Sequence, residues 1–266
     1  MGIVNVTPDS FYDGGRHDCV DAAVEHALML VEQGADIIDI GGASSRPGSV
    51  LITPAQELRR VLPVVEKLVK YFKGPISVDT PWSEVAAEVI DAGAQWINDI
   101  SAGRFDKRLI PLIAGRGCTI VVMHSRGTPQ SMQQCTSYKN VTPEVKDELL
   151  AAVAGFINGG VKREKIILDP GIGFAKTAQQ NVELLQNLEE FTNTGYSVLI
   201  GTSRKSFIGS ICGKEVNERL YGTLGTVASA FSRGVRFFRV HDIKETADFL
   251  KVFSVIENNL PIDHFC

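Results

Sequence analysis

The sequence predicts an α/β protein built as a single (β/α)8 TIM barrel, in which eight parallel strands alternate with helices. Short apolar runs rich in valine and isoleucine recur eight times in 266 residues, as expected for strands buried on both faces of a parallel sheet. Helical patterns lie between these runs. Nearly every run ends in polar residues, which a barrel would gather at one mouth. A doubly wound sheet is the alternative fold for the same alternation.

The predicted strands are bounded by glycine, proline or polar residues. In chain order they are GIVNV (2–6), ADIIDI (35–40), PISVD (75–79), AQWIND (94–99), CTIVVMH (118–124), KIILD (165–169), SVLIG (197–201) and VRFFRVH (235–241). Their side chains show little strict alternation between apolar and polar, which favours a parallel sheet covered by helices.

The predicted helices place apolar side chains at helical spacing and carry start and stop signals. Thr53 and Thr142 are each followed by the proline that favours a first turn, while Ser83 and Asp242 are candidate caps. Gly34 is a typical helix stop. The predicted ranges are 18–34, 53–72, 83–93, 142–160, 177–191, 216–233 and 242–258.

Composition and charge narrow the classes of protein that the chain can belong to. With 44% hydrophobic and 22% charged residues, it is ordinary globular protein, and we expect one domain over residues 1–266. A net charge of −4 argues against nucleic acid and membrane surfaces as partners. Five scattered cysteines without a C-x-x-C pair favour a reduced, cytoplasmic chain over a disulfide framework or a zinc site. No apolar run approaches the roughly 18 residues of a membrane span.

Polar residues at the strand ends predict a site. A polar end on one strand is explained by turn capping, but eight that converge make a polar pocket inside an apolar ring. The residues are Asn5, Asp39, Asp79, Asn98 with Asp99, His124, Asp169, Ser203, and Arg239 with His241. Three loops at this end, residues 7–17, 41–53 and 124–141, are unusually long, and the first two suit lids over a substrate.

Two motifs resemble nucleotide-binding loops but fail in detail. DPGIGFAK (169–176) lacks the third glycine of a dinucleotide loop, although Gly171 and Gly173 still allow close approach of a ligand to the backbone. GTSRKS (201–206) has an arginine where a P-loop needs glycine. Its Lys205 is a candidate Schiff-base nucleophile, a surface ammonium or a ligand-binding cation.

The last predicted strand suits an anion. In FRVH (238–241), Arg239 and His241 alternate on one side of the strand, where many barrels bind phosphate. The alternative is a core histidine beside an arginine that pairs with a strand-end aspartate. Arg46, on the second loop, adds a further cation. A magnesium ion brought by a phosphorylated substrate, with Asn5 as an oxygen ligand, fits better than a preformed zinc or iron site.

Eight motifs, in order over nearly the whole chain, resemble those of the dihydropteroate synthase family. They are MGIVNVTPDSFYDGG, IIDIGGASSRPG, ISVDT, INDIS, MHSRGTPQSMQ, ILDPGIGFAKT, GTSRKSFIG and RVHDIKET. The resemblance implies a barrel enzyme that joins 7,8-dihydropterin-6-ylmethyl diphosphate to p-aminobenzoate, by SN1-like loss of diphosphate, to give 7,8-dihydropteroate for folate synthesis. It also implies a Mg²⁺ cofactor, inhibition by sulfonamides and a homodimer.

The same resemblance implies a role for each matching residue. Asp79, Lys205, Arg239 and His241 would be catalytic. The pterin would contact Asp79, Asn98, Met123, Asp169 and Lys205. The diphosphate would contact Asn5, Arg46, Arg239 and His241, with Asn5 also binding the metal. The p-aminobenzoate or sulfonamide would contact Phe11, Ser45, Pro47, Gly173, Phe174 and Ser203.

A few departures from the family pattern bear on these expectations. Ala43 stands where a glutamate is common, and Tyr12 replaces a small residue beside Phe11. The match begins inside the first motif, so the first part of strand one and any plug beneath the barrel are expected to be absent. Two alternative functions are a methyltetrahydrofolate-using methyltransferase and an inactive pterin-binding paralogue, and the retained Lys205, Arg239 and His241 argue against both.

Overall fold

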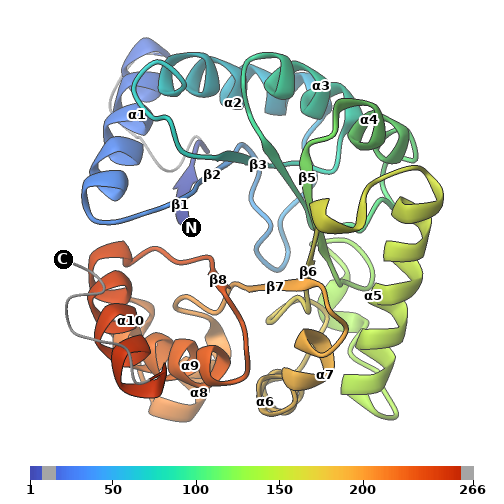
Figure 1. The fold of residues 1–266 in the computed structure, drawn as a ribbon, viewed down its shortest axis with the longest axis vertical. Helices are drawn as coiled ribbons and strands as arrows, with labels where there is room; N and C mark the ends of the chain where they lie inside the picture. The colour runs from blue at the N-terminus through green and yellow to red at the C-terminus, as the bar shows by residue number, and fades with distance from the viewer. Residues whose placement is uncertain (8–15, 259–266) are drawn as a thin grey trace.

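The eight strands form a closed parallel barrel with the helices outside it (Figure 1). A computed structural model describes residues 1–7 and 16–258, with side chains at 1–7 and 19–257. Each strand pairs with the next in chain order, and a parallel bridge between Gly2 and Val240 joins the last strand to the first. The strands are β1 (Gly2–Asn5), β2 (Ile38–Gly41), β3 (Ile76–Asp79), β4 (Trp96–Asp99), β5 (Thr119–Met123), β6 (Ile166–Asp169), β7 (Ser197–Ile200) and β8 (Phe237–Phe238).

This strand order confirms the barrel and excludes the doubly wound sheet. A doubly wound sheet reverses its strand order at a switch point, whereas here the order β1 to β8 is strictly sequential. The backbone N–H of Val240 donates to the Met1 carbonyl at 3.0 Å, and that of Ile3 donates to the Val240 carbonyl at 3.3 Å. These two hydrogen bonds close the ring.

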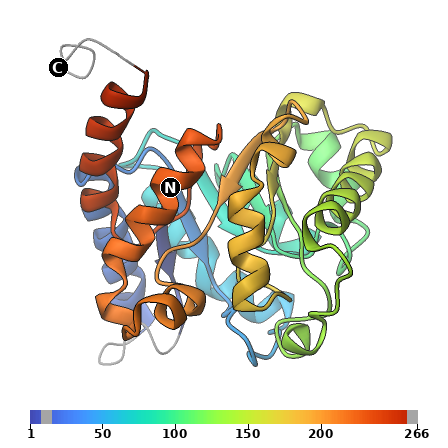
Figure 2. The ribbon, with the colours of Figure 1, turned by 90° about the horizontal axis from the view of Figure 1, so that it is seen from below.

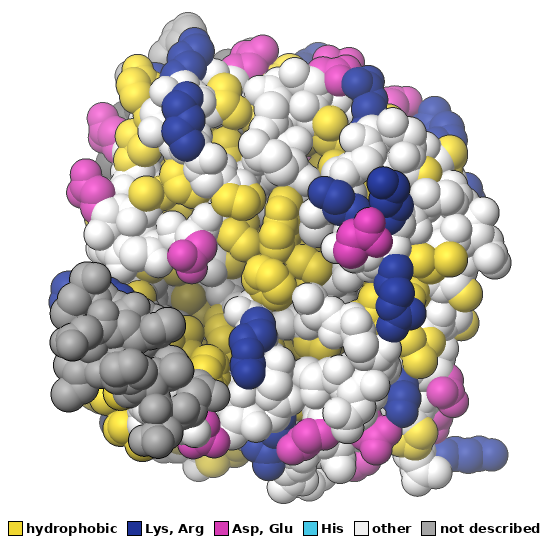
Figure 3. Space-filling model, viewed as in Figure 1, with side chains coloured by type: hydrophobic (Ala, Val, Ile, Leu, Met, Phe, Trp, Pro, Cys, Tyr) yellow, Lys and Arg dark blue, Asp and Glu magenta, His cyan; other side chains and the backbone are white. Residues whose placement is uncertain are grey.

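The barrel interior has an apolar layer beneath a polar one. Buried Ile37, Val121, Ile167 and Leu199 form one cluster, against which Trp96 and Phe237 pack. Because alternate residues of a strand point to the same side, the residues two positions further on also face the interior. In five of these strands those residues are Asp39, Asn98, Met123, Asp169 and Arg239. Figure 3 shows hydrophobic side chains at the centre of the face seen in Figure 1.

The helices cover the outside of the barrel, and α9 and α10 pack against each other on one side of it (Figures 1 and 2). They are α1 (Arg16–Glu32), α2 (Pro54–Leu68), α3 (Ser83–Asp91), α4 (Leu109–Arg116), α5 (Val141–Asn158), α6 (Ala178–Gln186), α7 (Glu189–Thr192), α8 (Ser206–Cys212), α9 (Leu220–Ser232) and α10 (Ile243–Asn258). In the described ranges, no helix combines the length and the apolar character that a membrane crossing needs.

Several helix boundaries differ from the predicted ones. Thr53 caps α2 as predicted, in a capping box with Gln56. The predicted Ser83 cap was wrong, because Ser83 is the first residue of α3 and its hydroxyl donates to Asp106 at 2.5 Å. Thr142 likewise lies inside α5, which begins at Val141. The sequence analysis missed α4 and α8 because both are short, and α4 contains a proline.

Candidate functional site

Three strand ends meet at Arg239, which follows β8. Its Nε donates to Asp39 Oδ2 at 2.6 Å, and its Nη2 lies 3.4 Å from Asp79 Oδ2. Asn98 Nδ2 donates to the same Asp39 oxygen at 3.4 Å. Asp79 stands next to Asn98 in the pairing of β3 with β4. The structure therefore brings together four polar strand ends, from β2, β3, β4 and the segment after β8.

Two buried acceptor atoms in this group lack a partner. Asn98 and Asp39 are 4% and 0% exposed, and within the described residues neither Asn98 Oδ1 nor Asp39 Oδ1 accepts a hydrogen bond. A buried acceptor left unpaired costs about 1–3 kcal/mol. A ligand N–H placed beside Asn98 Oδ1 would remove that cost, so the geometry favours a ligand with donors along one edge.

Two carboxyl groups at this mouth, those of half-buried Asp79 and buried Asp169, have pKa values shifted toward neutral pH. Burial raises the pKa of Asp79 well above its usual value, against the opposing charge of Arg239. Burial also raises the pKa of Asp169 to about 6, against a hydrogen bond from the Gly171 N–H at 2.7 Å and the charge of Lys205. Clustered acids with shifted pKa values are typical of functional sites.

Lys205, Gly173 and Phe174 converge from two loops. Burial lowers the pKa of Lys205 to about 8, while the charge of Asp169 opposes the shift. Its Nζ lies 4.2 Å from the centre of the Phe174 ring. Gly173 has φ +85°, and a Cβ there would lie 2.9 Å from Lys205 Cδ. The lysine is thus a half-buried cation of the barrel mouth, not a surface ammonium.

His241 is exposed and bonds to Ser203. Its Nδ1 lies 2.9 Å from Ser203 Oγ, and its backbone N–H donates to the same oxygen at 3.2 Å. Loss of hydration, and then the charges of Arg239 and Arg204, lower the pKa of His241 to about 4. Near pH 7 the imidazole offers a hydrogen bond, and Arg239 supplies the fixed positive charge of this strand. Arg239 pairs with the strand-end aspartates Asp39 and Asp79, as the alternative interpretation of this strand expected.

The loop after β2 carries the exposed cation Arg46. Ser49 Oγ donates to the Arg46 carbonyl at 2.7 Å, and the Gly48 N–H donates to the Pro129 carbonyl at 2.9 Å, so this loop contacts the loop after β5. Ser45 is half-buried and Pro47 is exposed beside Arg46. Phe11 and Tyr12 lie outside the described residues, as does most of the predicted lid 7–17.

Asn5 ends β1 at the same mouth. In the pairing of the first three strands, Gly41 stands between Asn5 and Asp79. A Cβ built at Gly41 would lie 3.8 Å from both Asn5 Oδ1 and Asp79 Cβ. Met123 ends β5 beside Asp169 and is 3% exposed, which makes it an apolar neighbour of that carboxyl group.

Sequence reasoning missed the partners of several site residues. Asp39 was named only as a polar strand end, although it is the carboxylate closest to Arg239. The signal was its position two residues after Ile37, which faces the interior.

Lys176 was not singled out, yet it is a buried cation that bonds to His124. Asp99 is structural, since it accepts from the N–H groups of Ser101 and Gly103.

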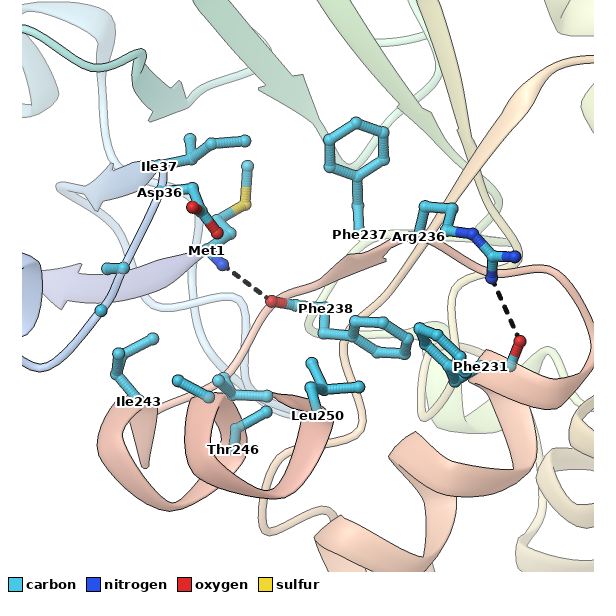
Figure 4. Close-up of a pocket in the computed structure, with 14 residues that line it drawn as sticks. Met1, Asp36, Ile37, Phe231, Arg236, Phe237, Phe238, Ile243, Thr246 and Leu250 are labelled. Carbon is cyan, nitrogen blue, oxygen red and sulfur yellow. Dashed lines mark hydrogen bonds between the residues drawn. The ribbon is translucent and has the colours of Figure 1, made fainter. Parts of the chain in front are cut away.

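A separate pocket lies at the other end of the barrel (Figure 4). Its volume is about 280 Å³, and its lining includes Ile37, Phe237, Phe238 and Leu250. Figure 4 shows these side chains between the strand beginnings and α10. None of the predicted site residues lines this pocket, because the site gathers at the strand ends.

Comparisons with known proteins identify the family of this chain. Residues 1–241 match the family model described as pterin binding enzyme. Dihydropteroate synthase from Synechocystis sp. is 44% identical over 253 residues, which cover 95% of this chain and 88% of that protein.

Solved structures of dihydropteroate synthases also resemble this chain in fold and sequence. Xanthomonas albilineans dihydropteroate synthase with 4-aminobenzoic acid has a TM-score of 0.92 at 40% identity, covering 98% of this chain and 93% of that one. Yersinia pestis dihydropteroate synthase in a sulfonamide drug complex has a TM-score of 0.91 at 36% identity, covering 97% and 94%. With Asp79, Asn98, Asp169 and Lys205 gathered at one barrel mouth, the chain belongs to the pterin-binding enzymes and, within them, to the dihydropteroate synthase family.

Proposed function

We propose that this chain condenses 7,8-dihydropterin-6-ylmethyl diphosphate with p-aminobenzoate, releasing diphosphate and forming 7,8-dihydropteroate. The observation that carries the proposal is the buried acceptor Asn98 Oδ1, which lacks a partner among the described residues; Asp79 pairs beside it on β3, and Asp169 ends β6 at the same mouth. Relatives of this family are dihydropteroate synthases over nearly the full length of the chain. A pterin has the row of N–H donors that such a group of acceptors needs.

The pterin would lie across the polar layer of the barrel. Asp79 and Asp169 would accept from its amino group and ring N–H groups, and Asn98 can both donate and accept. Lys205 Nζ would donate to the pterin carbonyl or ring nitrogen. Met123, buried at the end of β5, would form the apolar wall beneath the ring.

The diphosphate would occupy the side of the mouth near β8. Arg239 supplies the nearest fixed charge, while neutral His241 donates a hydrogen bond from a ring N–H. Exposed Arg46 would close over the phosphates with its loop. These cations stabilise the negative charge that grows as diphosphate leaves.

Magnesium fits this arrangement as an ion shared with the substrate. In the described part of the chain, no three or more His, Cys, Asp or Glu side chains form a metal cluster, and Asn5 offers one amide oxygen at the mouth. Such a sparse ligand set suits magnesium, which keeps several waters and substrate oxygens. Bound there, the ion would neutralise leaving-group charge.

The reaction would proceed by ionisation followed by capture. The bond between the pterin methylene carbon and the diphosphate oxygen breaks first, and the electron pair leaves with the diphosphate. Asp79, once ionised, stabilises the positive charge left on the pterin methylene. The aniline nitrogen of p-aminobenzoate then bonds to that carbon and loses one proton. The amine needs no strong general base, because the carbon is already cationic.

The aminobenzoate would lie between the loops after β2, β6 and β7. Gly173 leaves room beside Lys205, and the Phe174 ring provides an apolar face. Ser203 offers a hydroxyl, and Ser45 with Pro47 comes from the loop that carries Arg46. Phe11 belongs to this proposed subsite by sequence alone. Sulfonamides would occupy the same subsite as mimics of the aminobenzoate.

A homodimer is proposed through the helices on the side of the barrel. The ranges expected to supply it are 177–191, 216–233 and 242–258. The last two expose large apolar side chains, namely Tyr221 (83% exposed), Val252 (63%) and Ile256 (73%). Ile211 in α8 adds a fourth at 64%. Grouped exposed apolar side chains are typical of association surfaces. We further propose a single domain over residues 1–266 and a cytoplasmic protein, since within the described residues Cys118, Cys135 and Cys212 form no disulfide.

A turnover assay tests the proposed function. Purified protein is supplied with the pterin diphosphate, p-aminobenzoate and magnesium, and 7,8-dihydropteroate is measured by chromatography. We expect one dihydropteroate for each diphosphate released, with loss of both products when p-aminobenzoate is replaced by benzoate. Diphosphate release without dihydropteroate, or no turnover by the wild-type protein, would contradict the proposal.

A further inference from the structure

A buried lysine joins the loops after β5 and β6. Lys176 is 3% exposed, and its Nζ contacts three acceptors: His124 Nδ1 at 3.0 Å, the Gly171 carbonyl at 3.0 Å and the Phe174 carbonyl at 2.9 Å. An ammonium has three N–H donors, so the three contacts satisfy it completely. Burial lowers the pKa of Lys176 to about 7, and below that pH the ammonium requires His124 Nδ1 to accept, which places the ring proton on Nε2.

The other side of the His124 ring continues the chain of hydrogen bonds. Nε2 lies 3.1 Å from Glu148 Oε2 on α5, so the ring N–H donates to that carboxylate. Arg126 holds Glu148 from outside, with its Nε 3.1 Å from Oε1 and its guanidinium 3.8 Å from the centre of the Tyr138 ring. Burial, and then the charge of Lys176, lower the pKa of His124, which agrees with a neutral ring.

Lys176, at the inner end of this series of hydrogen bonds, fixes the loop that would contact both proposed substrates. Lys176 binds the carbonyls of residues 171 and 174, and so it holds the short segment that contains Gly173. Within the same loop, the Gly171 N–H donates to Asp169 Oδ1 at 2.7 Å, and the Phe174 ring lies against Lys205 Nζ. A shift of the two carbonyls would move Gly173 and Phe174 relative to Lys205.

We infer that Lys176, His124 and Glu148 form a positioning relay that sets the loop 170–176 and thereby the p-aminobenzoate subsite. The inference rests on the proposed function for the identity of that substrate. The three residues act through the loop and do not touch the reacting atoms. Without the relay, the carbonyls of residues 171 and 174 lose their shared donor. Gly173 and Phe174 then shift in the aminobenzoate subsite.

Variants of His124 separate the bond between Lys176 and His124 Nδ1 from the bond between His124 Nε2 and Glu148. In His124→Asn the amide oxygen can accept from Lys176 in the place of Nδ1, whereas His124→Leu offers no acceptor. Lys176→Met removes the donor itself. Lys146→Met is the matched control. Lys146 lies on α5, as Glu148 does, but it pairs with Glu190 at the surface, at 2.7 Å.

The first measurement is steady-state kinetics with calorimetry of aminobenzoate binding in the presence of pterin, diphosphate and magnesium. We expect Lys176→Met and His124→Leu to raise the aminobenzoate KM and Kd at least tenfold, with kcat changed less than threefold. His124→Asn should stay within threefold and Lys146→Met within twofold of wild type. Loss of folded protein alone would lower the apparent kcat at unchanged KM. An unchanged aminobenzoate Kd in His124→Leu would overturn the inference.

The second measurement does not depend on turnover. Nitrogen-15 NMR of the histidine rings, assigned with His124→Asn, should show His124 neutral and protonated on Nε2 from pH 5.5 to 8. In Lys176→Met the pKa of the ring should rise above its wild-type value, because the neighbouring cation is gone, while burial still favours the neutral ring. A wild-type ring that is protonated on Nδ1, or charged near pH 6, would overturn the relay. If the wild-type enzyme showed no turnover, the proposed function would fail while this measurement still judged the relay.

Discussion

Replacing Asp39 by asparagine tests how the barrel mouth is held together. Asp39 is fully buried and bonds to Arg239 at 2.6 Å, whereas the second partner of that arginine, Asp79, lies at 3.4 Å. The Asp39→Asn variant keeps the shape and an acceptor oxygen but removes the closer negative charge. The arginine is then left with one longer ion pair.

The expected cost can be worked out from these contacts. Removing one side of a buried ion pair costs about 3–5 kcal/mol. The lower end applies, because Asp79 still faces Arg239. The asparagine oxygen restores a neutral hydrogen bond worth about 1 kcal/mol. We therefore expect Asp39→Asn to lower the free energy of unfolding by about 2 kcal/mol.

Urea titration at pH 7 measures this cost against a matched control. Asp91→Asn removes the same charge from an exposed pair with Arg116, in which the side chains are 52% and 43% exposed. Pairs of that kind contribute about 1 kcal/mol or less. If Asp39→Asn were no more destabilising than Asp91→Asn, the mouth would not depend on the buried pair, and the reasoning would be wrong.

The same variant has a second consequence for Asp79. The charge of Asp39 helps to raise the pKa of Asp79, and the charge of Arg239 lowers it. Removing the Asp39 charge takes away one repulsion and frees the arginine for Asp79, so both changes lower this pKa. The acidic limb of the kcat/KM profile should move to lower pH in Asp39→Asn. A limb at the wild-type pH would contradict the assigned role of Asp79.

Three further predictions concern the substrates and the helix α2. Asp169→Asn places an amide where an acceptor faces ligand donors, so pterin affinity should fall by about 1–3 kcal/mol in calorimetry, and a change within twofold would refute the pterin contact. Burial raises the pKa of Glu57 to about 8, so the folded state keeps a proton that the unfolded chain releases above about pH 4.5. Wild-type stability should therefore fall relative to Glu57→Gln as pH rises from about 5 to 8, by a few kcal/mol, and a pH-independent difference in urea titrations would argue against the buried acid. Because Arg46 shares its loop with Ser45 and Pro47, p-aminobenzoate should bind tightly only with pterin, diphosphate and magnesium present, and equal affinity without them would refute a loop-built subsite.

The fold could be predicted from the sequence because each strand carries its own local signal. Runs such as CTIVVMH and KIILD are apolar through their middle, and only a sheet covered on both faces can bury them. The helices α4 and α8 were missed because eight and seven residues give too few turns for a clear periodicity. The Ser83 cap failed because the serine had a better partner in Asp106, 23 residues away in sequence.

The candidate site was predicted as a set of residue types, and its pairings were not. The position of Asp79, Asn98 and Asp169 at strand ends follows from the alternation of strand and helix. That Arg239 bonds to Asp39 depends on the closure of the barrel, which joins residues 200 positions apart. The lowered pKa of His241 depends on loss of hydration and on neighbouring cations, which no local pattern reports.

The closure of the barrel between Gly2 and Val240 has a consequence for folding. These residues are separated by nearly the whole described chain, and their bridge cannot form until the eighth strand exists. The earlier strands pair with immediate neighbours in sequence, so they can assemble before the ring closes. Contacts between residues this distant in sequence slow folding. Until the barrel closes, the open sheet exposes the unpaired edges of its first and last strands. During synthesis the nascent chain therefore carries two unpaired edges until its last strand leaves the ribosome, and this interval is when aggregation or chaperone capture competes with closure.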